Sequence, residues 1–162
     1  MVSEDGRSLP PAPKMFRPRD FAGRPLGADA EDALNLPDFD LMTLEEAHEE
    51  ALRFFDAGNY FGAHEAWETC WVFAKGTDEE EFFKGLAQLG AGYTHWLRGN
   101  PHGVVALLGR AMERIGSLGP AHRGIATEAF MRQLEALRVL AARAEAEGTP
   151  LPELERQPVP RS

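Results

Sequence analysis

The residues of this chain best placed to do chemistry are a histidine and a glutamate one helical turn apart, His64 and Glu68. They lie in the stretch 58–71, which reads GNYFGAHEAWETCW. Drawn as a helix at about 100° per residue, this stretch gives one face to five side chains: Tyr60, His64, Trp67, Glu68 and Trp71. The two indoles mark that face as core, so the imidazole and the carboxylate both need hydrogen-bond partners there.

Two polar residues of another predicted helix are the expected partners. Gln88 and His95 lie seven residues apart, on one flank of the apolar face of a helix predicted over residues 77–98. We expect them to meet His64 and Glu68 across the interface between the two helices.

Three kinds of function fit this four-residue cluster. The one we favour is a structural hydrogen-bond network that fixes how the two helices dock within a binding or interaction domain. The second is metal or small-ligand binding, because His64, Glu68 and His95 form a two-histidine, one-carboxylate set suited to iron, manganese or zinc, as in a metal-dependent enzyme. The third is acid–base catalysis, since clustered ionisable groups often mark sites.

Several other chemistries lack their motifs. The sequence His64-Glu65-x-x-Glu68 has a glutamate where the His-Glu-x-x-His zinc proteases have their second histidine. The chain does not supply the two Glu-x-x-His pairs of di-iron helix bundles. Acyl transfer, nucleotide hydrolysis and nicotinamide chemistry have no support, because no nucleophile elbow, phosphate-binding glycine loop or dinucleotide fingerprint is present.

Length and composition favour one helical domain with an acidic surface. With 162 residues, of which 43% are hydrophobic, the chain is long enough for a single core. A formal net charge of −9 argues against nucleic-acid and membrane-surface binding, which depend on clustered Lys and Arg. The lone Cys70 cannot form an intrachain disulfide, and no apolar run has the length of a membrane span. We expect a cytoplasmic protein whose partner is another protein or a small molecule.

Cap residues divide the apolar pattern into five helices. We expect them over residues 43–57, 59–76, 77–98, 100–119 and 127–148. The sequences 43–46 and 77–80 have the Thr-x-x-Glu pattern of capping boxes, which begin the first and third helices. The pairs Gly58-Asn59 and Gly99-Asn100 each end one helix and begin the next. Thr127 is the predicted N-cap of the fifth helix.

These elements predict an all-α fold, a compact bundle of two antiparallel α-hairpins and a C-terminal helix, with the repeated Gly-Asn junction suggesting an internal duplication. The helical domain is expected over residues 41–148. The Pro-rich segments 1–40 and 149–162 are expected to be a mildly basic arm and an unstructured tail, both dispensable for folding. Through apolar anchors from Phe16 to Phe39, the arm is a candidate contact to a neighbouring subunit of a homo-oligomer.

Three stretches resemble one known family. They are FFDAGNYFGAHEAWETCW (54–71), FFKGLAQLGAGYTH (82–95) and RGNPHGV (98–104). A Gly-x-Tyr-x-x-x-His-Glu-x-x-Glu helix, followed by a Gly-Leu-x-Gln helix that ends in His and then Gly-Asn, resembles the prokaryotic domain-of-unknown-function family 309. Seven residues match this pattern: His64, Glu65, Glu68, Gly85, Gln88, His95 and Asn100. Asp56 departs from it, standing where the family often has Asn. The resemblance covers roughly residues 43–140 and implies an all-helical fold without naming an activity.

A weaker likeness connects Gly58-x-Tyr60-x-x-Ala63-x-x-x-Trp67 with tetratricopeptide hairpins, in which small and aromatic residues let paired helices approach. Two hairpins are fewer than such a solenoid normally needs, so we expect a closed bundle instead.

Overall fold

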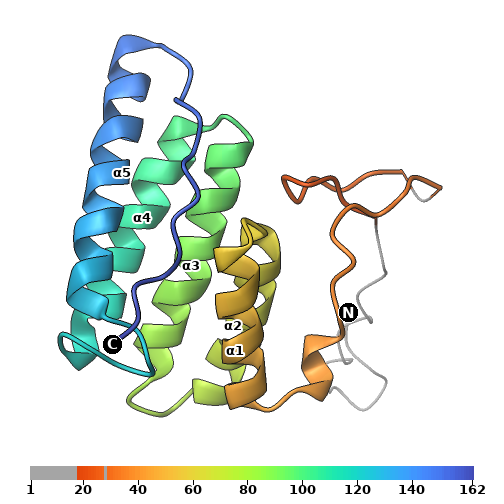
Figure 1. The fold of residues 1–162 in the computed structure, drawn as a ribbon, viewed down its shortest axis with the longest axis vertical. Coiled ribbons are helices and arrows are strands. Elements are labelled where there is room, and N and C mark those ends of the chain that lie inside the picture. The colour runs from red at the N-terminus through yellow and green to blue at the C-terminus, as the bar shows by residue number, and fades with distance from the viewer. Residues whose placement is uncertain (1–17, 28) are drawn as a thin grey trace, which may run out of the picture.

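The computed structural model describes residues 18–27 and 29–162, which form an all-helical domain (Figure 1). Its five α-helices are α1 (Leu44–Asp56), α2 (Tyr60–Ala74), α3 (Glu80–Leu97), α4 (Pro101–Ile115) and α5 (Thr127–Glu147). Two short 3-10 helices, η1 (Phe39–Leu41) and η2 (Gly116–Leu118), precede α1 and follow α4. Within the described residues there is no β-strand, and no helix is long and apolar enough to cross a membrane. The predicted all-α bundle of five helices is confirmed.

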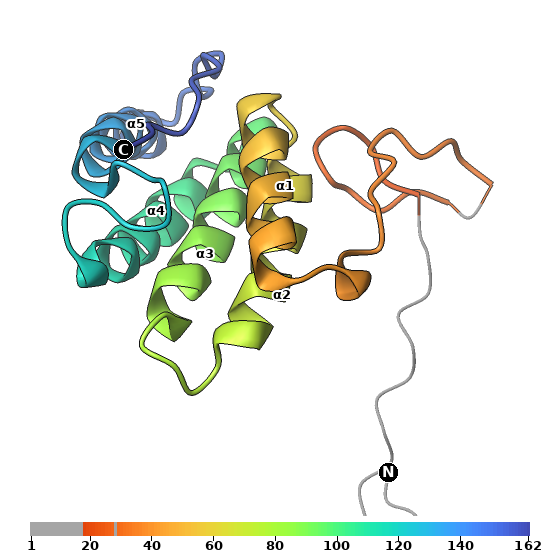
Figure 2. The same ribbon diagram turned by 60° about the horizontal axis from the view of Figure 1, so that its bottom comes forward.

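Each helix packs on its neighbour in the sequence (Figures 1 and 2). Helices α1 and α2 form one hairpin, α3 and α4 form the second, and the two hairpins meet through α2 and α3. Aromatic rings tie α5 into the same core: the ring of Phe55 in α1 lies 4.7 Å from that of Tyr93 and 5.9 Å from that of Phe130 in α5, centroid to centroid. The helices therefore share one core rather than stacking as an open solenoid.

The two Gly-Asn junctions are built alike, as the sequence predicts. Gly58 and Gly99 have φ angles of +82° and +70°, in the left-handed region that glycine adopts without a Cβ penalty. The side-chain oxygen of Asn59 accepts from the amide of Gly62 at 2.9 Å, and that of Asn100 accepts from the equivalent glycine of α4 at 3.2 Å. The capping box at 43–46 is also present, with both reciprocal bonds.

Three predicted helix ends are wrong. Helix α3 begins at Glu80, without a capping box. The Thr77 hydroxyl donates to the Ala74 carbonyl at the end of α2, 2.7 Å away, and accepts from the amide of Glu79, while the Glu80 carboxylate accepts from the amide of Gly76. Thr127 is the first residue of α5 and not its N-cap, and its buried hydroxyl donates to the carbonyl of Ile125. Helix α4 ends at Ile115, where the chain tightens into η2.

The core-facing side of α2 differs in part from the face drawn on the sequence. Trp67 is fully buried, as predicted. Trp71 is only half-buried, so the expectation that both indoles are core residues holds for one of them. The buried residues of α2 are Tyr60, Gly62, Ala63, Ala66, Trp67, Cys70 and Ala74. His64, Glu68 and Trp71 therefore lie on the flank of the helix, where water has access.

The C-terminal segment 149–162 has no regular secondary structure, yet it packs along the domain (Figure 1). Val159 is buried in the core, and its amide donates to the Asp56 carboxylate at 2.9 Å. The same carboxylate pairs with Arg161 at 2.6 Å, and the Trp96 indole donates to the carbonyl of Pro152 at 2.9 Å. The expectation of an unstructured tail is therefore wrong, because single anchors hold a segment that has no helical period.

The described part of the N-terminal arm lies against its own domain. The guanidinium of Arg19 stands 4.4 Å from the ring centroid of Phe61 in α2, and Leu34 and Phe39 are buried. Residues 1–17, including the proposed anchor Phe16, lie outside the described part of the chain.

Candidate functional site

Helix α2 approaches α3 closely at His64. Gly90 of α3 lies against the His64 backbone, so closely that a Cβ on Gly90 would come within 2.8 Å of the His64 nitrogen and Cα. The absence of a side chain at Gly90 lets the two backbones touch. This contact fixes the position of His64 along the axis of α3.

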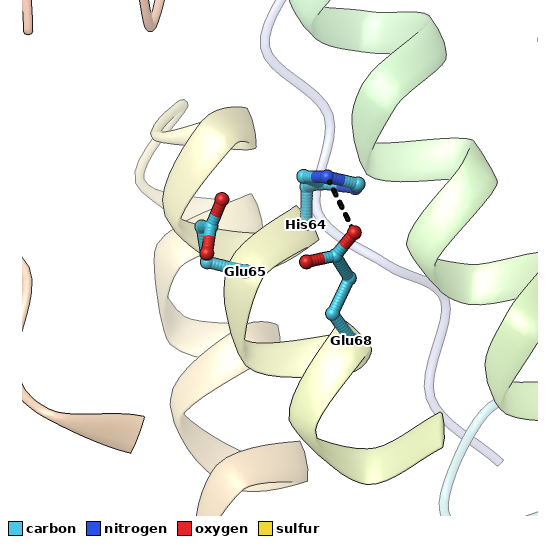
Figure 3. A group of neighbouring side chains, drawn as sticks. All are labelled: His64, Glu65 and Glu68. Carbon is cyan, nitrogen blue, oxygen red and sulfur yellow. Dashed lines mark ion pairs between the residues drawn. The ribbon is translucent and has the colours of Figure 1, made fainter. Parts of the chain in front are cut away.

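The imidazole of His64 is oriented from both of its nitrogens. Its Nδ1 lies 2.7 Å from the carbonyl oxygen of Ala87 in α3. Because a carbonyl can only accept, Nδ1 carries a proton and donates it. Its Nε2 lies 3.3 Å from Oε1 of Glu68, one turn along α2 (Figure 3). In the neutral ring Nε2 therefore carries a lone pair, directed to the carboxylate side of the site.

Glu65 completes a three-residue cluster with this pair. One ligand atom each from His64, Glu65 and Glu68 can be chosen so that all three lie within 4.8 Å of one another. In Figure 3 one oxygen of the Glu68 carboxylate is joined to His64, and the other points to the side on which Glu65 lies. The side chains of His64 and Glu68 are 21% and 37% exposed, so the cluster is reached by solvent.

The electrostatics of the cluster favour a positive charge. Burial of the His64 ring disfavours its protonated form, but the hydrogen bond and charge of Glu68, the Ala87 carbonyl and the charge of Glu65 together outweigh burial. The pKa of His64 is consequently raised above its usual value. Two carboxylates and a carbonyl that stabilise an imidazolium can stabilise a bound cation in the same way.

Gln88 and His95 do not join His64 and Glu68, contrary to the sequence-based prediction. The side-chain oxygen of Gln88 accepts from Arg114 of α4 at 3.0 Å. His95 Nδ1 lies 3.1 Å from the amide nitrogen of Asn100, at the start of α4. The two residues share one flank of α3, as predicted, but that flank faces α4. The flank facing α2 carries Ala87 and Gly90 instead.

A cavity adjoins the carboxylates of the cluster. It has a volume of about 440 Å³ and lies between η1 and the second half of α2. Nine residues line it: Pro37, Asp38, Phe39, Asp40, Glu65, Glu68, Thr69, Val72 and Phe73. Glu65 and Glu68 thus belong both to the His64 cluster and to the cavity wall. The contribution of η1 was not predicted, because residues 37–41 carry no periodic pattern in the sequence.

His48, the buried histidine of the described residues, has a structural role. His48 of α1 accepts from the Trp67 indole at Nδ1, 3.1 Å away, and its Nε2 lies 3.0 Å from the carbonyl oxygen of Arg123. Both ring nitrogens are thus used to hold α2 and the loop before α5. His48 is buried and has no open ligand position.

Comparison with known proteins finds a family match within this helical core. Residues 48–107 match the model of the family described as Domain of unknown function (DUF309). This match confirms the resemblance to that family that the sequence indicates. The matched segment of the DUF309 domain includes the whole His64 cluster, His95 and Asn100. No curated protein and no solved structure matches the chain. The tetratricopeptide-like character of the first hairpin stays a prediction.

Proposed function

We propose that this protein binds a divalent first-row metal ion through His64, Glu65 and Glu68. The observation that carries the proposal is the hydrogen bond from His64 Nδ1 to the Ala87 carbonyl. Histidines that ligate metals usually donate their other ring N–H to a carbonyl or carboxylate, which fixes the ring and its tautomer. His64 has this arrangement, and its Nε2 is the atom grouped with the two carboxylates.

The exposure of the cluster supports metal binding over the structural network favoured from the sequence. That network requires a dry helix interface, in which His64 and Glu68 satisfy each other away from water. Their side chains are 21% and 37% exposed to solvent, so an ion has access to both. A mainly structural ion pair at this exposure would contribute little, since exposed pairs are worth about 0–1 kcal/mol.

The donor set indicates which metals fit. One imidazole nitrogen and two carboxylate oxygens suit Zn²⁺, Mn²⁺ or Fe²⁺. They suit Cu⁺ poorly, because Cu⁺ prefers the sulfur ligands of Cys and Met. Three protein ligands leave further coordination positions for water or a substrate, as catalytic zinc sites do. A metal held here would act as a Lewis acid and lower the pKa of bound water next to the cavity.

Equilibrium dialysis of the purified full chain against Zn²⁺ and Mn²⁺ tests the proposal. We expect about one ion per chain in the wild type, and binding at least tenfold weaker in His64→Ala and in Glu68→Gln. His95→Ala is the matched control, because it removes a histidine of α3 that lies outside the cluster, and its affinity should be unchanged. Equal metal binding in Glu68→Gln and wild type, or no binding in either, would refute the assignment.

A further inference from the structure

The cavity beside the cluster is bordered by apolar side chains that remain in contact with water. Val72 and Phe73, which line it from the last turns of α2, are 62% and 52% exposed, and Leu41, which follows the lining residue Asp40 in the sequence, is 84% exposed. These are three of the six large apolar side chains that are exposed in the described part of the chain. Exposed apolar side chains gathered at a concave site are typical of a protein-interaction surface.

The charged residues that line the cavity are all acidic. Four of the nine residues lining the cavity are acidic, namely Asp38 and Asp40 from η1 and its cap and Glu65 and Glu68 from α2, and none is basic. A ligand that enters the cavity therefore needs positive charge to compensate these carboxylates, and apolar groups to cover Phe73 and its neighbours. Electrostatic complementarity of this kind selects partners and speeds their association.

We propose that the cavity between η1 and α2 docks a segment of a partner protein that carries Lys or Arg beside an apolar side chain. The aliphatic stem of such a residue would lie along Val72 and Phe73 while its charged head reaches the carboxylates. A small organic amine would satisfy the charges but leave the two apolar side chains in water. The exposed apolar border thus favours a peptide segment as the occupant.

Peptide titration of the full-length chain tests this assignment. Three fluorescent peptides of about ten residues are compared by anisotropy in the presence of EDTA: one alternating Lys with Leu and Phe, one with Glu in place of Lys, and one with Ser in place of the apolar residues. We expect the first to bind about tenfold more tightly than either of the others. Equal affinities for all three would overturn the proposal. Complete displacement of the bound basic-apolar peptide by spermidine at the same concentration as the peptide would overturn it too.

Matched variants locate the binding. Asp38→Asn combined with Glu65→Gln should weaken the basic-apolar peptide about tenfold, and Asn keeps a side-chain oxygen to cap η1, as Asp38 does now. Phe73→Ser should weaken it to a similar extent without removing a buried group. Glu147→Gln, which removes one negative charge at the exposed end of α5, is the control and should leave affinity unchanged. Insensitivity to both cavity variants would contradict docking at this site.

The result is separable from that of metal binding, although Glu65 and Glu68 serve both. EDTA removes divalent ions from the peptide titration, so peptide binding is measured whether or not the cluster takes a metal. Phe73→Ser alters no residue of the proposed metal set, so it should weaken the peptide while leaving dialysis against Zn²⁺ unchanged.

Discussion

His64 in α2 donates from Nδ1 to the carbonyl oxygen of Ala87 in α3, over 2.7 Å. This bond joins the packing of the two hairpins to the chemistry of the cluster, because the helix contact sets which nitrogen of the ring faces the carboxylates. The close approach at Gly90 makes the bond possible. Changes to the α2–α3 contact should therefore alter both stability and cation binding.

Gly90→Ala tests this link. The new Cβ would meet backbone atoms of His64 at 2.8 Å, which only a shift of one helix relieves. We expect a loss of about 2 kcal/mol in the free energy of unfolding, measured by urea denaturation, together with weaker Zn²⁺ binding.

Gly109→Ala is the matched control in α4, since nothing lies within 4 Å of the position of its Cβ. There the better helix propensity of Ala should stabilise the protein by up to about 1 kcal/mol. The account of helix approach fails if the two substitutions change stability in the same direction.

The titration of His64 provides a second prediction. Its pKa should lie above the value of about 6.5 for an ordinary histidine, and it should fall in Glu68→Gln. Since the folded-state pKa is the higher one, the stabilisation by this charge is complete below pH about 6.5 and is lost as pH rises through the folded-state pKa. Histidine NMR titrations of both proteins would show it, and a midpoint that Glu68→Gln leaves in place would contradict the pairing.

His48 should respond to pH in the opposite direction. The pKa of His48 is lowered, and the largest cause is its burial. Protonation at Nδ1 would also place an N–H of His48 opposite the N–H of the Trp67 indole, which now donates to that nitrogen. The unfolded chain thus takes up the proton first, and this group's contribution to stability falls as pH drops below about 6.5.

His48→Ala removes the acceptor of the Trp67 indole and leaves a cavity, so it should cost about 3 kcal/mol. His102→Ala, at a side chain that is 81% exposed, should change stability by less than about 0.5 kcal/mol. Denaturant unfolding at pH 7.5 compares the two, and similar small effects would show that the His48 bonds are unimportant.

The C-terminal segment should be needed for full stability. A chain ending at Gly148 loses the buried Val159, the partners of Asp56 and the acceptor of the Trp96 indole. Burial of Val159 and these bonds together lead us to expect a loss of about 3 kcal/mol, seen as a lower melting temperature. An unchanged melting temperature would show that residues 149–162 are dispensable for stability.

The sequence predicts local features of this fold well, because they depend on short spacings. The Gly-Asn junctions, the first capping box and the His64–Glu68 pair all follow from residues within one turn of each other. Thr77 shows the limit, since no pattern reveals that its hydroxyl donates to a carbonyl at the preceding helix end.

Contacts between elements were harder to predict. Helix α3 packs against both α2 and α4, and periodicity alone does not say which flank faces which neighbour, so Gln88 and His95 were assigned to the wrong interface. Glu65 was not assigned to the cluster, because on a helical projection it lies about 100° away from His64. The cavity wall from η1 and the anchor at Val159 left no periodic signal, because each rests on single side chains in Pro-rich segments.

Anomalous diffraction from crystals of the Zn²⁺-loaded full chain tests the central claim most directly. Data collected on both sides of the zinc absorption edge locate the ion without assumption. We expect a peak about 2.0–2.2 Å from His64 Nε2 and from carboxylate oxygens of Glu65 and Glu68. A zinc peak found only elsewhere, such as at the exposed His102–Glu145 pair, would show that the His64 cluster is not a metal site.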